Sequence, residues 1–599
     1  MASFVHLKRV CVATLLCLGL GAQHASAKDS ASAIPYRVRI RGVRDKDLAR
    51  EMKAVSDAME RVKSPPASEL QLRRRLDADV DRFQRVLRAH GYYRAAVTTD
   101  IDMDRRPARI RFRIDKGEPY RLREIRLVSA DAGSAGPEPP DPADIGLSIG
   151  AVARANVVLR AEERLAQDFQ RRGYPFTRIE NREIHVEHAT RAMDVTFVYE
   201  PGPFATFGRV TITGAPSVRE SYVRGKMLWA EGEPYNGDQV ALARRRLAGT
   251  DLFASVRVAP EPDAEPDPAL PMRVDVVERK PRTLGFGAGY RSDEGARARL
   301  SWEHRNLFGA GERFHIGASV SEIGFGGEMR FSRFDFKRND QTLSLLLRAA
   351  QEDTDAFHSR NAGALLGLDR LFSNGITGGL GLGYKYSEVR DDGSDPLERF
   401  GLVYVPVRWD WDRSDNWLDP RRGWRWSSSF APYTDTLGSG LAFVKARAGY
   451  TRYARLTRRP ELDWAGRLAG GVLFGASRDA VPADERFYAG GGGSVRGYGY
   501  QMAGELDDKK PKGGTSMVLA SSELRWRITR EIGAVVFADG GTASASGFPE
   551  SDELFWAAGW GARYFTPVGP LRLDMAFPLD RRAGVDKPYQ FYISLGQAF

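Results

Sequence analysis

Alternation with a period of two dominates residues 283–599. Several short segments place apolar and aromatic side chains on one face of the expected strand: Val403, Val405, Val407, Trp409, Trp411, Leu524, Trp526, Ile528, Leu571, Leu573, Met575 and Phe577. The opposite face of the same segments is mostly charged: Tyr404, Arg408, Asp410, Asp412, Glu523, Arg525, Arg527, Arg572 and Asp574. Strands of this kind, repeated along a segment, are typical of a β-barrel with lipid outside and water inside.

The length of this segment predicts the size of the barrel. Sixteen strands of about 10 residues each, with connections of similar length, fill residues 283–599. Sixteen candidate strands are found, an even number as single-chain bacterial barrels require. The last one, QFYISLGQAF, places Phe591, Ile593, Leu595 and Phe599 on the lipid face and ends the chain on an aromatic residue.

The first expected strand, TLGFGAGYR, differs from the others because one of its faces is made of glycine: Gly285, Gly287 and Gly289. Glycine packs nothing and weakens a strand. The seam between the first and last strands is therefore a candidate weak point, the lateral gate of a barrel that opens. Loose packing toward the lumen accounts for the glycines equally well.

The N-terminal half repeats one pattern about every 80 residues. The segment LRAHGYYRAAV (87–97) returns as DFQRRGYPFTRI (168–179) and more loosely as LAGTDLFASVRV (247–258), without the Gly-Tyr pair. Each copy continues into an alternating strand and a glycine turn. We predict three β-α-α-β-β modules, at residues 34–118, 119–204 and 205–281, before a barrel at 282–599.

Other features of this half are interpreted as surface. The proline-rich and acidic stretches at 136–144 and 260–271 are predicted to be solvated insertions within modules. His185 and His188 are three residues apart on an expected strand and so point to opposite faces. No metal site is predicted.

Residues 1–27 are predicted to be an export signal. Lys8 and Arg9 precede an apolar run, and Ala25-Ser26-Ala27 forms a small-residue cleavage site. The run is too short to span a membrane as a helix, and Leu16 before Cys17 disfavours a lipoprotein site. Both cysteines lie in this segment, so the mature chain is expected to contain no thiol. Its formal charge falls from +11 to +9, and that charge is too dispersed to indicate nucleic-acid binding.

The segment RFYAGGGGSVRGYGY (486–500) raises a separate question. No lysine follows its glycines and no helix is indicated, so a phosphate-binding loop is disfavoured. Its aromatic and aliphatic residues are poor choices for an open linker. The remaining interpretation is a loop that turns back into the barrel, with Gly490 and Gly491 allowing close approach to the wall.

This loop resembles the signature of the outer-membrane insertase superfamily, the barrels that carry polypeptide-transport-associated (POTRA) domains. Four further segments match that family: NLFGAGE at 306, RSDNWLDPRRG at 413, FADGG at 537 and the run 559–574. Three modules, the RFYAGG lead-in and the QFYISLG ending most resemble the translocation and assembly module branch. The central insertases usually carry five such domains, and two-partner secretion transporters carry two and a plugging helix.

The resemblance implies a site and a function. The loop motif Val495-Arg496-Gly497-Tyr498 is expected to fold into the lumen, with Arg496 against Phe537, Asp539 and Glu523. The implied function is assembly of autotransporters and other barrel proteins in the bacterial outer membrane, with the modules in the periplasm. The implied partners are unfolded client proteins, outer-membrane lipids and a TamB-like protein anchored in the inner membrane, without a cofactor. A passive pore or a secretion channel remains the alternative; G-x-S-x-G, H-E-x-x-H and phosphate-loop motifs of enzymes are absent.

Overall fold

The computed structural model describes residues 33–130, 136–261, 269–292, 294–372, 375–391, 396–566 and 569–595. The predicted export signal, including both cysteines, and Phe599 lie outside these residues. The chain divides into two compact units, and each is described by itself. One comprises Met1–Val210, Trp229–Ala241 and Ala259–Met272, and the other Thr211–Leu228, Leu242–Val258 and Arg273–Phe599.

The first module is a three-stranded sheet covered by helices. Its elements are β1 (Tyr36–Arg41), α1 (Lys46–Val55), α2 (Asp57–Glu60), η1 (Arg61–Lys63), α3 (Glu69–Ala89), β2 (Ala96–Asp102) and β3 (Ala108–Asp115). The strand order is β1-β3-β2, with β1 parallel to β3. Phe83 of α3 packs edge-on against Phe112 of β3, with ring centroids 4.9 Å apart. The apolar stripe of α3 thus forms the core with the sheet.

The second module has the same sheet but differs in its helices. Its elements are β4 (Arg121–Ser129), α4 (Ala155–Arg171), β5 (Arg178–Glu187) and β6 (Ala192–Glu200), in the order β4-β6-β5. The described residues between β4 and α4, 136–154, form turns and extended chain. The predicted β-α-α-β-β order is therefore wrong in this detail, because this proline-rich and acidic stretch contains no helix among its described residues.

The third module explains the missing Gly-Tyr pair. It contains β7 (Thr206–Thr213), α5 (Glu220–Arg224), α6 (Gly237–Gly249), β8 (Phe253–Pro260) and β9 (Ala269–Glu278), in the order β7-β9-β8. Gly91 and Gly173 follow the long helices of the first two modules with φ of +89° and +101°. Asp251 holds the corresponding place after α6, with φ +62°. Aspartate is one of the few residues that tolerate this region, so the turn persists without glycine.

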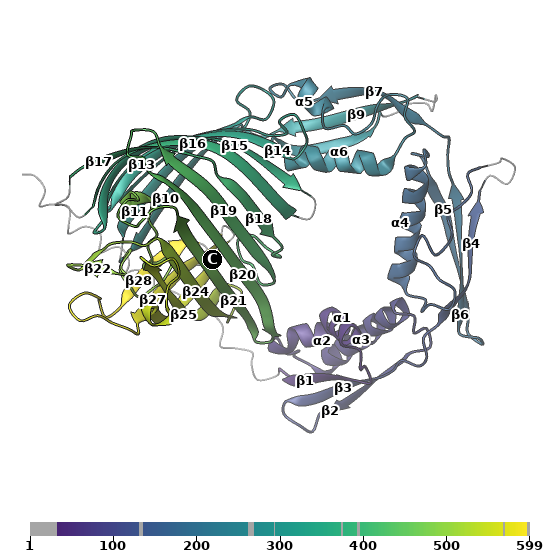
Figure 1. Ribbon diagram of the computed structural model, residues 1–599. Coiled ribbons are helices and arrows are strands. Elements are labelled where there is room, and N and C mark those ends of the chain that lie inside the picture. Colours follow the sequence, from purple (N-terminus) through teal and green to yellow (C-terminus); the bar gives the residue numbers. More distant parts are fainter. Residues whose placement is uncertain are drawn as a thin grey trace, which may run out of the picture. The chain divides into compact units, whose positions relative to one another are not determined.

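The C-terminal part is a closed antiparallel barrel of sixteen strands among the described residues (Figure 1). The strands are β10 (Arg282–Arg291), β11 (Gly295–His304), β12 (Arg313–Ser321), β13 (Gly324–Arg333), β14 (Gln341–Asp353), β15 (Phe357–Phe372), β16 (Ile376–Asp391), β17 (Glu398–Tyr404) continued as β18 (Val407–Asp412), β19 (Gly423–Asp435), β20 (Ala442–Arg458), β21 (Glu461–Phe474), β24 (Ser516–Arg527), β25 (Ile532–Ser544), β26 (Phe555–Thr566), β27 (Gly569–Pro578) and β28 (Gln590–Leu595).

Pro406 divides β17 from β18 without shifting the register. On β16, Gly383 pairs with Tyr404 and Leu380 with Val407, so the spacing on the two strands is equal across the break. Proline has no N–H to donate to the ladder. The two segments are therefore one barrel strand with a missing hydrogen bond.

The two faces of the barrel wall follow the predicted alternation. On β24, Trp526 is 46% exposed whereas Glu523 is fully buried. Outward-facing apolar residues recur on many strands, including Phe286, Leu300 and Trp560. Charges therefore face the interior and apolar groups face outward, as a membrane barrel requires. No helix within the described ranges is long and apolar enough to cross a membrane.

The NLFGAGE segment forms a hydrogen-bonded turn between β11 and β12 that holds part of the third module. Asn306 donates from Nδ2 to the Ser217 carbonyl (2.9 Å) and accepts from Gly311 N (3.0 Å). Glu312 accepts from the backbone N–H groups of Phe308 and Ala310. This motif thus joins the segment around α5 to the barrel.

Candidate functional site

The loop between β21 and β24, residues 475–515, packs against the inner wall of the barrel. It contains η3 (Ala483–Glu485) and a short hairpin of β22 (Leu506–Asp507) and β23 (Lys510–Pro511). Phe487, Val495 and Tyr498 are buried in one cluster with Leu519 and Ala557 of the wall. These are the aromatic and aliphatic residues that made an open linker improbable. Burial of their side chains holds the loop inside the barrel.

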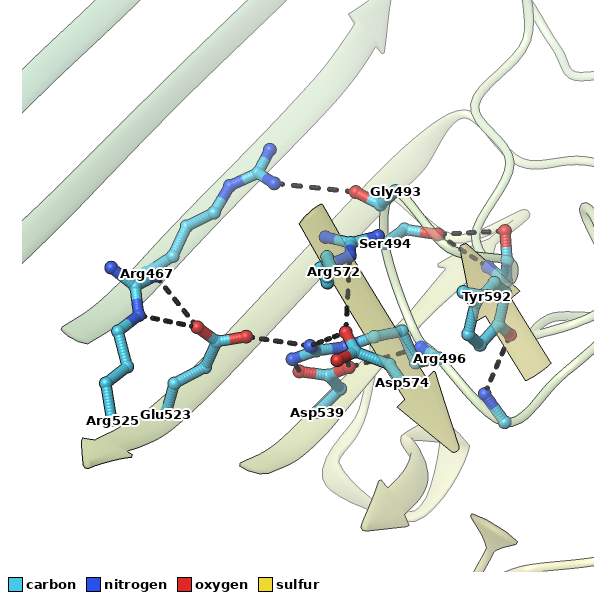
Figure 2. A network of polar contacts seen from close by, with 12 residues as sticks. Arg467, Gly493, Ser494, Arg496, Glu523, Arg525, Asp539, Arg572, Asp574 and Tyr592 are labelled. Carbon is cyan, nitrogen blue, oxygen red and sulfur yellow. Dashed lines mark hydrogen bonds and ion pairs between the residues drawn. The ribbon is translucent and has the colours of Figure 1, made fainter. Parts of the chain in front are cut away.

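Arg496 is 2% exposed and lies among three carboxylates of the wall (Figure 2). Its Nε and Nη2 donate to the two oxygens of Asp539, at 2.6 and 2.9 Å. Its Nη1 donates to Glu523 (2.7 Å) and to Asp574 (3.2 Å). The backbone N–H of Arg496 also donates to Asp539 (3.2 Å). The guanidinium therefore binds Asp539 through both arms of its fork, the strongest geometry available to such a pair.

An aromatic ring completes the arginine pocket. The Arg496 guanidinium carbon lies 3.5 Å from the ring centroid of Phe537, close enough for a cation–π contact. Phe537 and Asp539 are two residues apart on β25 and so share its inner face. Glu523 pairs with Phe537 across β24 and β25. Strand register thus brings these three residues to one patch.

Two glycines of β26 leave room for this patch. A Cβ on Gly559 would lie 2.4 Å from the ring of Phe537, and one on Gly561 would lie 2.1 Å from an oxygen of Asp574. Distances this short are excluded for carbon. The segment GWGAR therefore leaves a gap beneath the site. Its glycines are required because Phe537 and Asp574 pack directly against the backbone of β26.

The wall keeps charge partners of its own. Arg525 pairs with Glu523 at 2.8 Å, Arg572 lies 3.3 Å from Asp574, and Arg563 also pairs with Asp574. The three arginines and three carboxylates of the wall balance each other, and Arg496 adds one positive charge. Removal of Arg496 would leave Glu523 and Asp574 partnered. Asp539 would lose both of its bonds to the arginine side chain and keep only the backbone N–H of residue 496.

A second anchor holds the other limb of the loop. Glu485 accepts from Lys385 of β16 (2.6 Å) and from Lys445 of β20 (2.8 Å). Asp484 pairs with Lys385 (2.8 Å) and accepts from Ser387 of β16 (2.5 Å). The loop is therefore tied to the wall by an acidic cluster as well as by the basic Arg496.

Glu485→Gln is expected to weaken this second anchor. The change leaves Lys445 facing a neutral amide, and the free energy of unfolding should fall by about 2 kcal/mol, between the values for exposed and buried pairs. Chemical denaturation of the purified protein in detergent measures the change. Glu505→Gln is the matched control, because Glu505 belongs to the same loop but its side chain is 52% exposed, beside Arg478. Equal effects of the two substitutions would show that the second anchor adds no stability.

Among the described residues, the seam between the first and last strands is short. β10 pairs with β11 along its whole length, from Arg282 to Arg291. Its described pairing with β28 consists of Tyr290 with Ile593 and Arg291 with Tyr592. Ser292, just beyond β10, extends this end of the seam by donating to the Phe591 carbonyl (3.0 Å).

The predicted gate residues lie on these two strands. The three glycines of β10 alternate with Leu284 and Phe286, which are 72% and 78% exposed. Leu595 is the last described residue of β28. Of the seam residues named from the sequence, only Phe599 has no described place.

Sequence reasoning missed several residues that the structure places in the site. The alternation places Asp574 on the charged face of its strand but does not pair it with Arg496. Tyr592 alternates with the outward residues of β28 and lies inside at 0% exposure. The acidic anchor, Asp484 and Glu485, carried no recognised motif.

His185 and His188 do not form a pair: His188 bonds to Tyr120 (2.7 Å). Across the described ranges, no group of three or more metal-binding side chains is found.

Comparison with known proteins identifies the barrel. Residues 306–599 match the Omp85 superfamily domain, and residues 205–279 match a POTRA domain described as a surface antigen variable number repeat. The outer membrane protein assembly factor BamA of Nitratidesulfovibrio vulgaris is 26% identical over 479 residues, which cover 74% of this chain and 57% of the relative. BamA of Neisseria meningitidis serogroup B is 24% identical over 472 residues, covering 68% and 58%. The chain thus spans less than three fifths of the length of these relatives.

A solved structure shares the fold. BamA from Haemophilus ducreyi lacking POTRA domains 1-3 is similar with a TM-score of 0.66 at 18% identity, covering 80% of this chain and all of that one. This likeness shows a shared fold over that part of the chain. Residues 306–599, which hold the barrel from β12 onward, therefore form an Omp85 superfamily domain, preceded by a POTRA domain at residues 205–279.

Proposed function

We propose that the chain assists the insertion of β-barrel proteins into the bacterial outer membrane. Its barrel lies in that membrane and its POTRA domains lie in the periplasm. The curated relatives are named outer membrane protein assembly factors, which supports this class of function over an enzyme. The process required is strand pairing through hydrogen bonds, and no covalent bond is made or broken.

The few strand pairs described at the seam support the proposal. An unpaired amide in the hydrocarbon layer costs several kcal/mol, so a barrel normally pairs its strands fully. The described pairing of β10 with β28 involves two residue pairs. The glycines of β10 add little side-chain packing to it. A client strand could satisfy the amides that such a seam exposes, which makes the seam a lateral gate.

The sheets of the N-terminal half fit the handling of unfolded clients. In the first module the order β1-β3-β2 leaves β1 and β2 at the edges. An extended peptide can add a strand to such an edge through main-chain hydrogen bonds. This mode recognises backbone and therefore tolerates many client sequences.

We further propose that the chain acts in the translocation and assembly module branch, as a TamA-like barrel serving autotransporters. Three predicted POTRA domains, the RFYAGG lead-in and the QFYISLG ending support this assignment. The partner would be a TamB-like periplasmic protein. Crosslinking from the first module around Tyr36, in cells, would identify it.

A conducting channel, either a passive pore or a two-partner type secretion pore, is the second candidate. Two cavities of about 910 and 470 Å³ lie against the inner wall beside the loop; Arg447 lines both, with Tyr453 in the larger and Tyr433 in the smaller. A channel would show a large, stable single-channel conductance in planar bilayers. The loop that packs on the inner wall favours the assembly function, for which we expect small and unsteady conductance.

The proposed function is tested in cells that depend on this chain. Depletion should lower the amount of autotransporter and other barrel proteins in the outer membrane and leave periplasmic proteins unchanged. Quantitative proteomics of outer-membrane fractions measures both classes. Unchanged levels of all barrel proteins after full depletion would overturn the proposal.

A further inference from the structure

Tyr592 belongs to the seam and to the loop contact at once. On β28 it pairs with Arg291 across the seam and with Asp574 on the other side. Its side chain is fully buried, and its hydroxyl accepts a hydrogen bond from the backbone N–H of Gly497 at 3.1 Å. Gly497 follows Arg496 directly, and Figure 2 shows Tyr592 beside this part of the loop. The last strand therefore touches the peptide that carries the arginine.

The loop also presses on the ring of Tyr592. A Cβ on Gly492 would lie 2.9 Å from Cδ1 and 3.1 Å from Cε1 of Tyr592, so the backbone of Gly492 sits directly against the ring. The next residue, Gly493, has open space where its Cβ would be. Only the first of two adjacent glycines is thus packed on the last strand.

The contact continues into the arginine pocket. Tyr592 shares a buried cluster with Phe537. Phe537 in turn lies beneath the Arg496 guanidinium at 3.5 Å. A hydrogen bond, a ring contact and a shared cluster therefore join the loop to β28, whose described pairing with β10 is short.

We propose that Tyr592 is a positioning residue that couples the docked loop to the closed seam. With the loop docked, Gly492 and Gly497 hold Tyr592 inside, and β28 stays in register with Arg291. Withdrawal of the loop frees the ring and its hydroxyl, and β28 can then separate from β10. This inference rests on the proposed function, in which the seam opens for clients.

The test compares two adjacent alanine variants in a seam reporter. Cysteines at Tyr290 and Ile593, which pair across the seam, form a disulfide at a rate that reports closure in the purified full chain. Gly492→Ala should slow disulfide formation about tenfold, because the added methyl displaces the Tyr592 ring. Gly493→Ala should leave the rate unchanged. Equal rates for the two variants would overturn the coupling.

A second pair of variants removes one oxygen atom each. Tyr592→Phe leaves the buried N–H of Gly497 without its acceptor and should slow seam closure severalfold. Tyr453→Phe is the control, since Tyr453 is also buried and lies on β20, far from the seam. Its hydroxyl accepts a hydrogen bond from Arg425 (3.4 Å) on the neighbouring strand β19. If the two changes have the same effect, Tyr592 has no special link to the seam.

A second pair of cysteines outside the seam distinguishes general destabilisation of the barrel from a specific effect on the seam. Cysteines at Leu300 and Ala318, which pair between β11 and β12, should crosslink at the same rate in every variant. Slowing of this pair together with the seam pair would overturn the proposal in favour of a loosened barrel. No client is present, so the outcome is independent of the proposed function. A changed seam rate with normal client assembly in cells would contradict that function and leave the coupling intact.

Discussion

Arg496→Ala is expected to reduce the assembly of client barrels to the level seen in depleted cells, with the variant itself still inserted in the outer membrane. The substitution removes the bidentate pair with Asp539, the bond to Glu523 and the cation over Phe537. Removing one partner of a buried pair costs about 3–5 kcal/mol. Most of that cost falls on Asp539, because Glu523 retains Arg525.

The barrel survives this loss because the wall holds itself together. Its strands are joined by ladders that involve neither Arg496 nor the loop, and the wall charges around Arg496 balance without it. Arg447→Ala is a matched control, because Arg447 also faces the lumen and contacts the loop at Phe487, at 5.1 Å from the ring. Western blots of the variant and of its clients measure both outcomes. Full client levels with Arg496→Ala as the sole copy would show that the contacts of Arg496 with Asp539 and Glu523 have no role in assembly.

A double substitution separates stability from function. Arg496→Ala with Asp539→Ala removes both partners, so no buried carboxylate is stranded. We expect the free energy of unfolding to recover by about 1–3 kcal/mol relative to the single variant. Client assembly should remain impaired because the loop still lacks the contact between residues 496 and 539. Recovery of assembly along with stability would mean that the pair of Arg496 and Asp539 serves only to stabilise the barrel.

The period-two pattern was sufficient to predict the barrel, since each strand must turn its charges inward whatever its neighbours are. The family resemblance implied Glu523, Phe537 and Asp539 as partners of Arg496, and the strand register then brings Glu523 opposite Phe537. The contact of Asp574 with Arg496 was not predicted, because Asp574 lies two strands beyond Asp539. It reaches Arg496 across the gap left by Gly559 and Gly561. A strand pattern gives the face of a residue but not the depth at which a loop will meet it.

The remaining misses have the same origin in tertiary structure. The pairing of Glu485 with Lys385 and Lys445 joins a loop to strands 100 and 40 residues away. No spacing rule in the sequence reports such a contact. Tyr592 was missed, although it alternates with the outward residues of β28. Its bond to Gly497 depends on how far the loop descends, which side-chain packing decides.

Locking the seam should stop client assembly in a reversible way. Tyr290→Cys with Ile593→Cys places two cysteines on paired residues of β10 and β28. Cβ atoms of directly paired residues lie about 4.5–5.5 Å apart, within a small adjustment of disulfide geometry. In the oxidised protein β28 cannot leave β10, so the amides needed by a client strand stay paired. We expect client insertion to fall at least about tenfold and to return with reductant.

The matched control is an equal crosslink in a strand pair that has no reason to open. Leu300→Cys with Ala318→Cys joins β11 to β12, where pairing runs from Arg297 to His304. This disulfide should leave insertion unchanged, so a loss seen only with the seam pair isolates opening from rigidity. Insertion of a radiolabelled client into proteoliposomes, with and without reductant, measures the difference. Normal insertion through an oxidised seam would place the route of the client elsewhere, through the lumen or the surrounding bilayer, and β10 and β28 would then serve only to close the barrel.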